Sequence, residues 1–204
     1  MSAAVKIACL VEGHGECEAV PRLLHRIVRA IDSTLALVVN PVLRVPASRL
    51  IKPGEIERHV ELAARKIGGQ GGIFILLDSD DGCPAEDGPQ LLRRARAARD
   101  DLPVTVVFAQ REFEAWFLAA AESLRGFRGL PRDLTAPSDP EAIRGAKEWL
   151  EQRLPRHQCY SETLDQPAFT SRFDLDTARR ADSFDKCCRE VERMIACLKR
   201  TPAP

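Results

Sequence analysis

The chain has 204 residues, of which 45% are hydrophobic and 29% are charged, a composition typical of a globular protein with one well-formed core. Its 30 basic and 30 acidic residues give a formal net charge of +0, which excludes a general electrostatic attraction to nucleic acid or to an anionic membrane. No apolar run is long enough to span a bilayer, so we expect no membrane partner, and the first residues indicate a strand rather than a signal peptide.

Four apolar runs predict four β-strands, at residues 5–11, 35–45, 72–78 and 103–109, with the second strand broken or ended near Pro41. Such runs are typical of strands that are buried on both faces, as in parallel sheets. Apolar stripes with helical period lie between and after these strands, and they include Val20, Ile56, Leu91 and Phe113. This alternation predicts an α/β fold of the Rossmann-like three-layer α/β/α type, with a mainly parallel central sheet of about four strands.

The character of the sequence changes after residue 125. Residues 126–140 are rich in turn formers and predict an ordered loop or lid, residues 141–154 predict a short helix, residues 155–181 are polar and irregular, and residues 182–199 predict a last amphipathic helix. No second core is evident. We therefore expect a single domain, with a core at residues 1–125 and a C-terminal loop and helical extension at residues 126–204 packed on it.

The chain has seven cysteines, an odd number, and two of them are the adjacent Cys187 and Cys188. This pattern, without any C-x-x-C, is not that of a disulfide framework or a zinc site. We expect mostly buried thiols and a cytoplasmic location.

Acidic residues follow three of the four predicted strands. They are Glu12 and Glu16 after the first strand, Asp78, Asp80 and Asp81 after the third, and Glu112 and Glu114 after the fourth. Sites in open parallel sheets form outside the carboxyl ends of the strands, and adjacent strands lie about 4.8 Å apart, so these side chains can converge. Carboxylates in close proximity raise one another's pKa or bind a cation, and Mg²⁺ or Mn²⁺ suits such oxygen ligands. The sequence therefore predicts a magnesium or manganese site at this edge.

Each of these residues also has a simpler interpretation. The segment from Asp78 to Gly82 is compatible with a solvated turn, and Glu16 with a first-turn acid at the positive end of a helix. The Gly13-x-Gly15 pair lacks the third glycine and the downstream acid of a dinucleotide site, and no Walker lysine follows it. We therefore expect no nucleotide cofactor.

Taken in order, these residues resemble the Toprim superfamily, which is found in topoisomerases, bacterial primases and overcoming-lysogenization-defect nucleases. Its pattern is a glutamate after the first strand, matched by Glu12 in LVEGHGE, and D-x-D after the third, matched by Asp78 and Asp80 in LLDSDD. More narrowly, VEGHGE, LDSDD, REFEAWFLA, YSETLDQP and SFDKC together look like an uncharacterised bacterial Toprim-like family. Members of that family often sit beside ATPases in defence or mobile-element operons, and they often carry Thr where this chain has Gly15.

The resemblance implies a Toprim-like core and metal-dependent phosphodiester chemistry, as in a nuclease or a related phosphotransfer enzyme. The implied metal and catalytic residues are Glu12, Asp78 and Asp80, with Glu112 or Glu114 at a second metal position and Glu16 and Asp81 as accessory acids. Because Glu112 and Glu114 are two residues apart at a helix start, we expect only one of them to reach the metal. The positive charge that phosphoryl transfer requires would come from Arg111, Lys147 and Lys186.

Two other functions stay open at this point. One is a non-catalytic Toprim-like adaptor that docks on an ATPase. The other is a phosphoaspartate-type phosphatase, although the D-x-D motif of those phosphatases ends the first strand and here it ends the third. A nucleic-acid partner is compatible with the local basic run LLRRARAARDD, whereas the substrate and the oligomeric state are not specified by the sequence.

Overall fold

The structure is a computed structural model that describes residues 4–80, 82 and 84–200. Four strands form one sheet in the order β2-β1-β3-β4, and all neighbouring strands are parallel. They are β1 (Val5–Val11), β2 (Leu37–Arg44), β3 (Gly72–Asp78) and β4 (Val104–Ala109). The predicted α/β fold with a parallel sheet of about four strands is confirmed.

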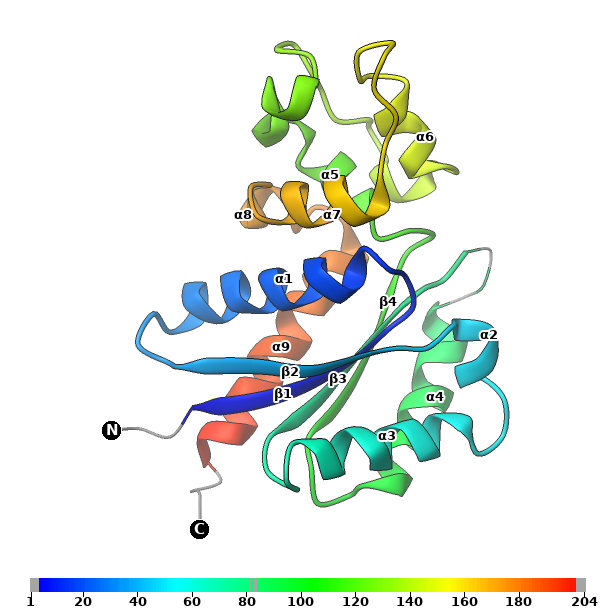
Figure 1. Cartoon of the computed structure of the whole chain (residues 1–204), viewed down its shortest axis with the longest axis vertical. Helices are drawn as coiled ribbons and strands as arrows, with labels where there is room; N and C mark the ends of the chain where they lie inside the picture. Colours follow the sequence, from blue (N-terminus) through cyan, green and yellow to red (C-terminus); the bar gives the residue numbers. More distant parts are fainter. Residues whose placement is uncertain (1–3, 81, 83, 201–204) are drawn as a thin grey trace.

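Helices cover both faces of this sheet and complete three layers (Figure 1). The helices α1 (Glu16–Ile31) and α9 (Asp182–Arg200) pack on one face, and α3 (Glu55–Lys66) and α4 (Pro84–Ala98) pack on the other. Successive side chains of a strand point to opposite faces. Cys9 and Phe74 therefore enter one buried cluster, whereas Leu10 and Ile75 enter the second.

The edge strand β2 continues through Pro41, where the sequence predicted a break or an end. The pairing register with β1 shifts at this place, between Ile7 and Cys9. An edge strand tolerates proline because the missing N–H can face away from the neighbouring strand. After β2, the short helix α2 (Ala47–Leu50) leads into α3.

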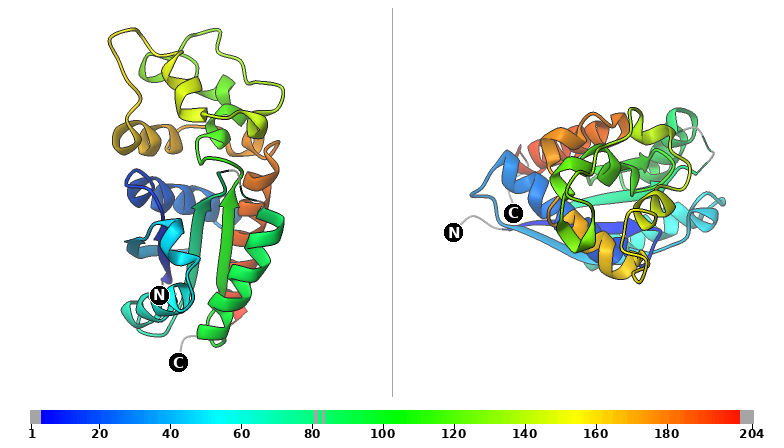
Figure 2. Two further views of the ribbon diagram at one scale, coloured as in Figure 1. Left: turned by 90° about the vertical axis from the view of Figure 1, so that its right-hand side faces the viewer. Right: turned by 90° about the horizontal axis from the view of Figure 1, so that it is seen from above.

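A helical layer formed by residues after β4 lies above the carboxyl ends of the strands (Figure 2). It contains α5 (Ala115–Ala119), α6 (Ala146–Glu151), α7 (Glu162–Thr170) and α8 (Leu175–Ala178), with 3₁₀ turns at Ala121–Leu124, Phe127–Gly129 and Pro140–Ala142. Phe117 and Phe169 of this layer belong to the same buried cluster as Phe74 of β3. The hydrophobic core is therefore continuous across the boundary at residue 125, and that boundary stays a prediction.

The helix α7 lies in a segment that we expected to be irregular, residues 155–181. It has no apolar stripe, since its buried residues include Asp165, Gln166 and Thr170, and Pro167 lies inside it. A helix with a polar buried face gives no hydrophobic period from which it could be predicted. The predicted helix around Phe113 also differs, because it divides into α5 and a 3₁₀ turn.

The described cysteines are free thiols. Cys9, Cys187 and Cys188 are buried, and burial raises the pKa of the Cys187 thiol well above its usual value, so this thiol is protonated and unreactive. Among the residues that the structure describes, no helix is long and apolar enough to cross a membrane.

Candidate functional site

Four carboxylates come together where β1, β3 and β4 end, beside α6 and α7. They are Glu12, Glu16, Asp78 and Glu114, and we call them the acid cluster. Burial raises the pKa of Asp78 well above its ordinary value, and the negative charges of the other three acids raise it further. The four side chains, which come from three separate segments, are therefore close enough to affect one another's ionisation.

Glu16 closes the turn between β1 and α1. Its Oε2 accepts hydrogen bonds from the backbone N–H groups of Glu12, at 2.9 Å, and of Gly13, at 3.2 Å. The side chain is only 3% exposed, and burial raises its pKa. Glu16 is thus a first-turn helix acid and also a member of the acid cluster, and its hydrogen bonds fix the backbone that carries Glu12.

Glu12 has one oxygen engaged and one without a partner. Its Oε1 accepts the N–H of Ala47, at the start of α2, at 3.1 Å. Its Oε2 is buried and has no hydrogen-bond partner in the described part of the chain. Buried polar atoms are rarely left in this state, so the oxygen is a candidate ligand for a cation or an ordered water.

The D-S-D motif places its two aspartates in different surroundings. Asp78 belongs to the acid cluster, and its Oδ1 accepts the backbone N–H of Phe113 at 2.9 Å, which ties β3 to the start of α5. Asp80 is exposed at the rim of the sheet. Asp81 lies outside the described residues.

The backbone is strained where β3 and β4 end. Asp80 (φ 47°) and Arg111 (φ 63°) both adopt the left-handed region, and the N–H of Asp80 donates to the carbonyl of Arg111 at 3.0 Å. The N–H of Arg111 in turn donates to the hydroxyl of the buried Ser79 at 2.8 Å. Non-glycine residues in this region are uncommon and concentrate at functional sites. Asp80 and Arg111 therefore lie at the same edge of the sheet as the acid cluster.

Glu114 is the most deeply buried acid of the cluster, with 0% of its surface exposed. Its Oε1 accepts two hydrogen bonds, from the Tyr160 hydroxyl at 2.9 Å and from the Gln166 side-chain amide at 3.2 Å. Its Oε2 is buried without a hydrogen-bond partner among the described residues. Burial raises the pKa of Glu114 to about 7, although the positive charge of Lys147 and the Tyr160 hydroxyl oppose the rise.

Glu112 lies beside α6 rather than in the cluster. Its Oε2 accepts the backbone N–H of Lys147 at 3.3 Å, in the first turn of that helix. A carboxylate at a helix N-terminus is stabilised by the unpaired N–H groups there. Of the two acids in REFE, the structure therefore brings Glu114 into the acid cluster and uses Glu112 to hold α6.

Lys147 supplies positive charge next to the acid cluster. Its Nζ lies 2.7 Å from Oε1 of Glu162 at the start of α7, and its side chain is 33% exposed. Burial would lower the pKa of Lys147, but the carboxylates of Glu114, Glu162 and Asp78 outweigh that effect and raise it. Lys147 is therefore a cation at neutral pH, and its single charge would balance only one of the four acids when all of them are ionised.

The two other basic residues predicted to contact phosphate lie in different places. Arg111 is in the turn between β4 and α5, at the carboxyl edge of the sheet. Lys186 is on α9, and its Nζ is 4.0 Å from the position that a Cβ would take at Gly88 of α4. Lys186 is therefore on the α4 side of the molecule.

Gln166 and Tyr160 were not among the site residues predicted from the sequence. Both residues contact Glu114. The motif YSETLDQP was itself a signal, but a polar stretch that contains proline does not indicate which side chains turn inward.

Gly15 allows α7 to lie against the start of α1. A Cβ at this position would lie 2.2 Å from the carbonyl oxygen of Glu162 and 2.4 Å from Oε1 of Gln166. Real Cβ atoms are not found this close to backbone atoms, so a side chain at Gly15 would displace α7. The turn needs no hydroxyl at this position, since the Glu16 carboxylate already accepts its N–H groups.

Replacing Gly15 by Ala should therefore lower the free energy of unfolding by about 1–3 kcal/mol, the usual cost of overpacking. Urea unfolding measures this loss. The matched control is Gly88→Ala, because Gly88 lies inside α4 and its Cβ would meet nothing closer than 3.8 Å. This control should be neutral or slightly stabilising, as alanine is in a helix interior. Equal stability of Gly15→Ala and the wild type would contradict the close approach of α7.

The acid cluster contains carboxylates of the kind that bind a divalent ion, but the described carboxylates do not surround one common position. Within the described residues, no three His, Cys, Asp or Glu side chains form a ready-made metal-binding group. The Oε2 atoms of Glu12 and Glu114, which lack a hydrogen-bond partner within residues 4–80, 82 and 84–200, are nevertheless carboxylate oxygens, which Mg²⁺ and Mn²⁺ prefer. The residues therefore fit such an ion, provided that their side chains rotate to meet it.

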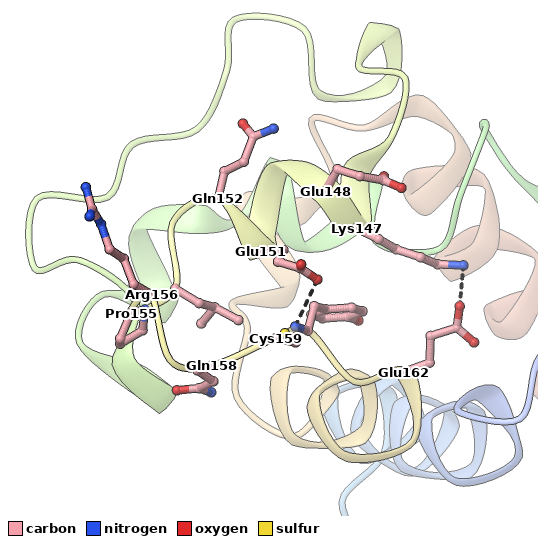
Figure 3. A pocket seen from close by; sticks show the side chains of 11 residues that line it. Lys147, Glu148, Glu151, Gln152, Pro155, Arg156, Gln158, Cys159 and Glu162 are labelled. Carbon is pink, nitrogen blue, oxygen red and sulfur yellow. Dashed lines mark hydrogen bonds and ion pairs between the residues drawn. The ribbon is translucent and has the colours of Figure 1, made fainter.

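A cavity of about 630 Å³ lies between α6 and the start of α7, and Lys147 and Tyr160 are among the residues that line it (Figure 3). Three glutamates line it, Glu148, Glu151 and Glu162, against the two cations Lys147 and Arg156. The three glutamates outnumber the two cations, so the lining of the cavity has a net negative charge. This makes it a poor site for a phosphate backbone.

Comparison with known proteins gives a family without an assigned function. The model described as "Domain of unknown function (DUF4276)" matches residues 11–192, a range that contains the whole acid cluster. The comparison with curated proteins gave no match, and neither did the comparison with solved structures.

Proposed function

Because the chain belongs to the DUF4276 family, whose description names no activity, we propose its function from the site itself: a Mg²⁺- or Mn²⁺-dependent nuclease or related phosphotransfer enzyme of Toprim type. The observation that carries this proposal is a pair of buried carboxylate oxygens near Asp78, one of Glu12 and one of Glu114, which have no hydrogen-bond partner among the described residues. Buried anionic oxygens without partners are costly, and a divalent cation would stabilise them.

Each acid has a separate task in this proposal. Glu12, Asp78 and Glu114 would hold the ion, while Glu16 would hold the backbone of Glu12 in place. The bound ion would stabilise the negative charge that develops on a transferring phosphoryl group. Asp80, at the exposed rim, is in a position to face the substrate or a second ion.

Positive charge for the phosphate would come from the rim of the sheet. Arg111 lies at the tip of β4, and Lys147 lies beside the acid cluster. The basic run of residues 91–99 is less suitable, because it lies in and after the second half of α4, which begins at the carboxyl edge of the sheet and leads away from it. We therefore propose that a nucleic-acid backbone would cross the carboxyl edge of the sheet.

The test is cleavage of labelled single- and double-stranded DNA and RNA by the wild-type protein, with Mg²⁺, Mn²⁺ or EDTA. We expect cleavage of at least one substrate with the ions and none with EDTA. Calorimetry should show saturable Mn²⁺ binding in the millimolar range or tighter. The absence of such binding would reject the metal site, whatever the substrate.

A second candidate is a non-catalytic Toprim-like adaptor that partners an ATPase. Lys147 favours it, since this lysine already provides part of the counter-charge that a metal would supply. An adaptor would bind no Mn²⁺, and its thermal stability would not change when the ion is added. The phosphatase alternative gains no support, because the D-x-D motif follows β3 rather than the first strand.

A further inference from the structure

We infer that Tyr160 and Gln166 are positioning residues of the proposed metal site: they hold Glu114 by one carboxylate oxygen so that the other oxygen is presented to the ion. This inference rests on the proposed function. It assigns a task to the segment that carries α7, which lies far from the other motifs in the sequence.

The hydrogen bonds of Glu114 are divided unequally between its two oxygens. Oε1 accepts both donors, the Tyr160 hydroxyl at 2.9 Å and the Gln166 amide at 3.2 Å, and Oε2 accepts none in the described part of the chain. The side chain is fully buried. Two donors on one oxygen fix the plane of a carboxylate, and outer hydrogen bonds of this kind orient metal ligands in proteins.

The donors are themselves held firmly. Gln166 is 3% exposed and lies against Gly15, where any side chain would collide with its amide oxygen. One residue earlier, the buried Asp165 accepts the N–H of Ser161 at 2.7 Å and pairs with Arg128. These contacts hold the start of α7 in place, and with it the neighbouring residues Tyr160 and Gln166.

This arrangement also accounts for Gln166, one of the polar side chains that α7 buries. Burying an amide or a carboxylate costs free energy unless hydrogen bonds compensate. An apolar residue at position 166 would satisfy packing equally well, but it could not orient Glu114. If Tyr160 and Gln166 were only packing elements, their loss would reduce stability and leave metal affinity unchanged, and this difference separates the two roles.

The experiment compares Tyr160→Phe and Gln166→Met with the wild type by Mn²⁺ calorimetry and thermal unfolding. Each variant should raise the Mn²⁺ dissociation constant by about 10- to 100-fold, the usual effect of losing an outer hydrogen bond to a ligand. The matched control is Ser183→Ala. The Ser183 hydroxyl accepts hydrogen bonds from Trp116 Nε1 at 2.8 Å and from the N–H of Gln110 at 3.1 Å, but it does not contact Glu114. The control should lose stability and keep its Mn²⁺ affinity.

A second measurement uses the wild-type protein alone. Tyr160 is the only tyrosine of the chain, so tyrosine labelled with ¹³C at Cζ gives a single NMR resonance. Titration with Mg²⁺ should shift this resonance with the dissociation constant that calorimetry gives for Mg²⁺. If the wild type binds neither ion, the proposed function fails and this inference fails with it. If the wild type binds Mn²⁺ and both variants bind it equally well, only the positioning role is overturned.

Discussion

Replacing Asp78 by Asn should abolish metal-dependent phosphodiester cleavage and leave the protein folded. The Asn side chain can still accept the N–H of Phe113, so the link between β3 and α5 survives. It cannot supply an anionic ligand, and the loss of several kcal/mol of transition-state stabilisation corresponds to a rate about 10³-fold lower. The metal-free variant should be as stable as the wild type or more stable, because one member of a mutually repelling cluster becomes neutral.

The matched control for this variant is Asp80→Asn, which changes the other aspartate of the same motif. Asp80 is exposed and lies outside the acid cluster, so we expect a smaller loss of activity and no loss of Mn²⁺ affinity at the Glu12–Asp78–Glu114 site. Cleavage rates and Mn²⁺ calorimetry measure both variants. Full activity of Asp78→Asn would show that the reaction does not depend on this cluster.

Replacing Lys147 by Met should destabilise the metal-free protein, and added Mn²⁺ should reverse the loss. The change removes the cation beside two acids of the cluster, the fully buried Glu114 and the partly buried Asp78. Removing one partner of a buried charge pair costs roughly 3–5 kcal/mol. The ion pair of Lys147 is with Glu162, and the two side chains are 33% and 44% exposed, so we expect a smaller loss of about 1–2 kcal/mol. Urea unfolding in EDTA and in Mn²⁺ measures the loss and its reversal.

Lys186→Met is the control, because it removes the same charge from a lysine that lies beside Gly88 and not beside the acids. It should change stability little, and equally with and without Mn²⁺. A loss in Lys147→Met that is as large in Mn²⁺ as in EDTA would mean that Lys147 is a structural counter-charge. That result would favour the adaptor.

The layered core was predictable because its signals are local. The runs VKIACLV and GIFILLD are apolar without interruption, which indicates strands buried on both faces, and the stripe that contains Val20 predicts an amphipathic helix. The parallel topology then places every strand end at one edge. For this reason Glu12, Asp78 and one of the two acids Glu112 and Glu114 could be proposed as neighbours before the structure was known, although the choice of Glu114 could not be made and Asp80 was included.

The contacts around the acids depend on features that a single sequence does not reveal. The left-handed backbone of Asp80 interrupts the strand alternation, so the D-x-D spacing does not place both aspartates on one side. The task of Gly15 depends on α7, which follows it by more than a hundred residues in the sequence. The buried face of α7 is polar, so no periodicity predicts that Gln166 turns toward Glu114.

The central claim is that acids from separate segments share one divalent ion, and a crystal soaked in Mn²⁺ tests it most directly. Our account predicts anomalous density at a single position that contacts the carboxylates of Glu12, Asp78 and Glu114. Density only on exposed acids, or none at all with Lys147 Nζ in contact with those carboxylates, would contradict it.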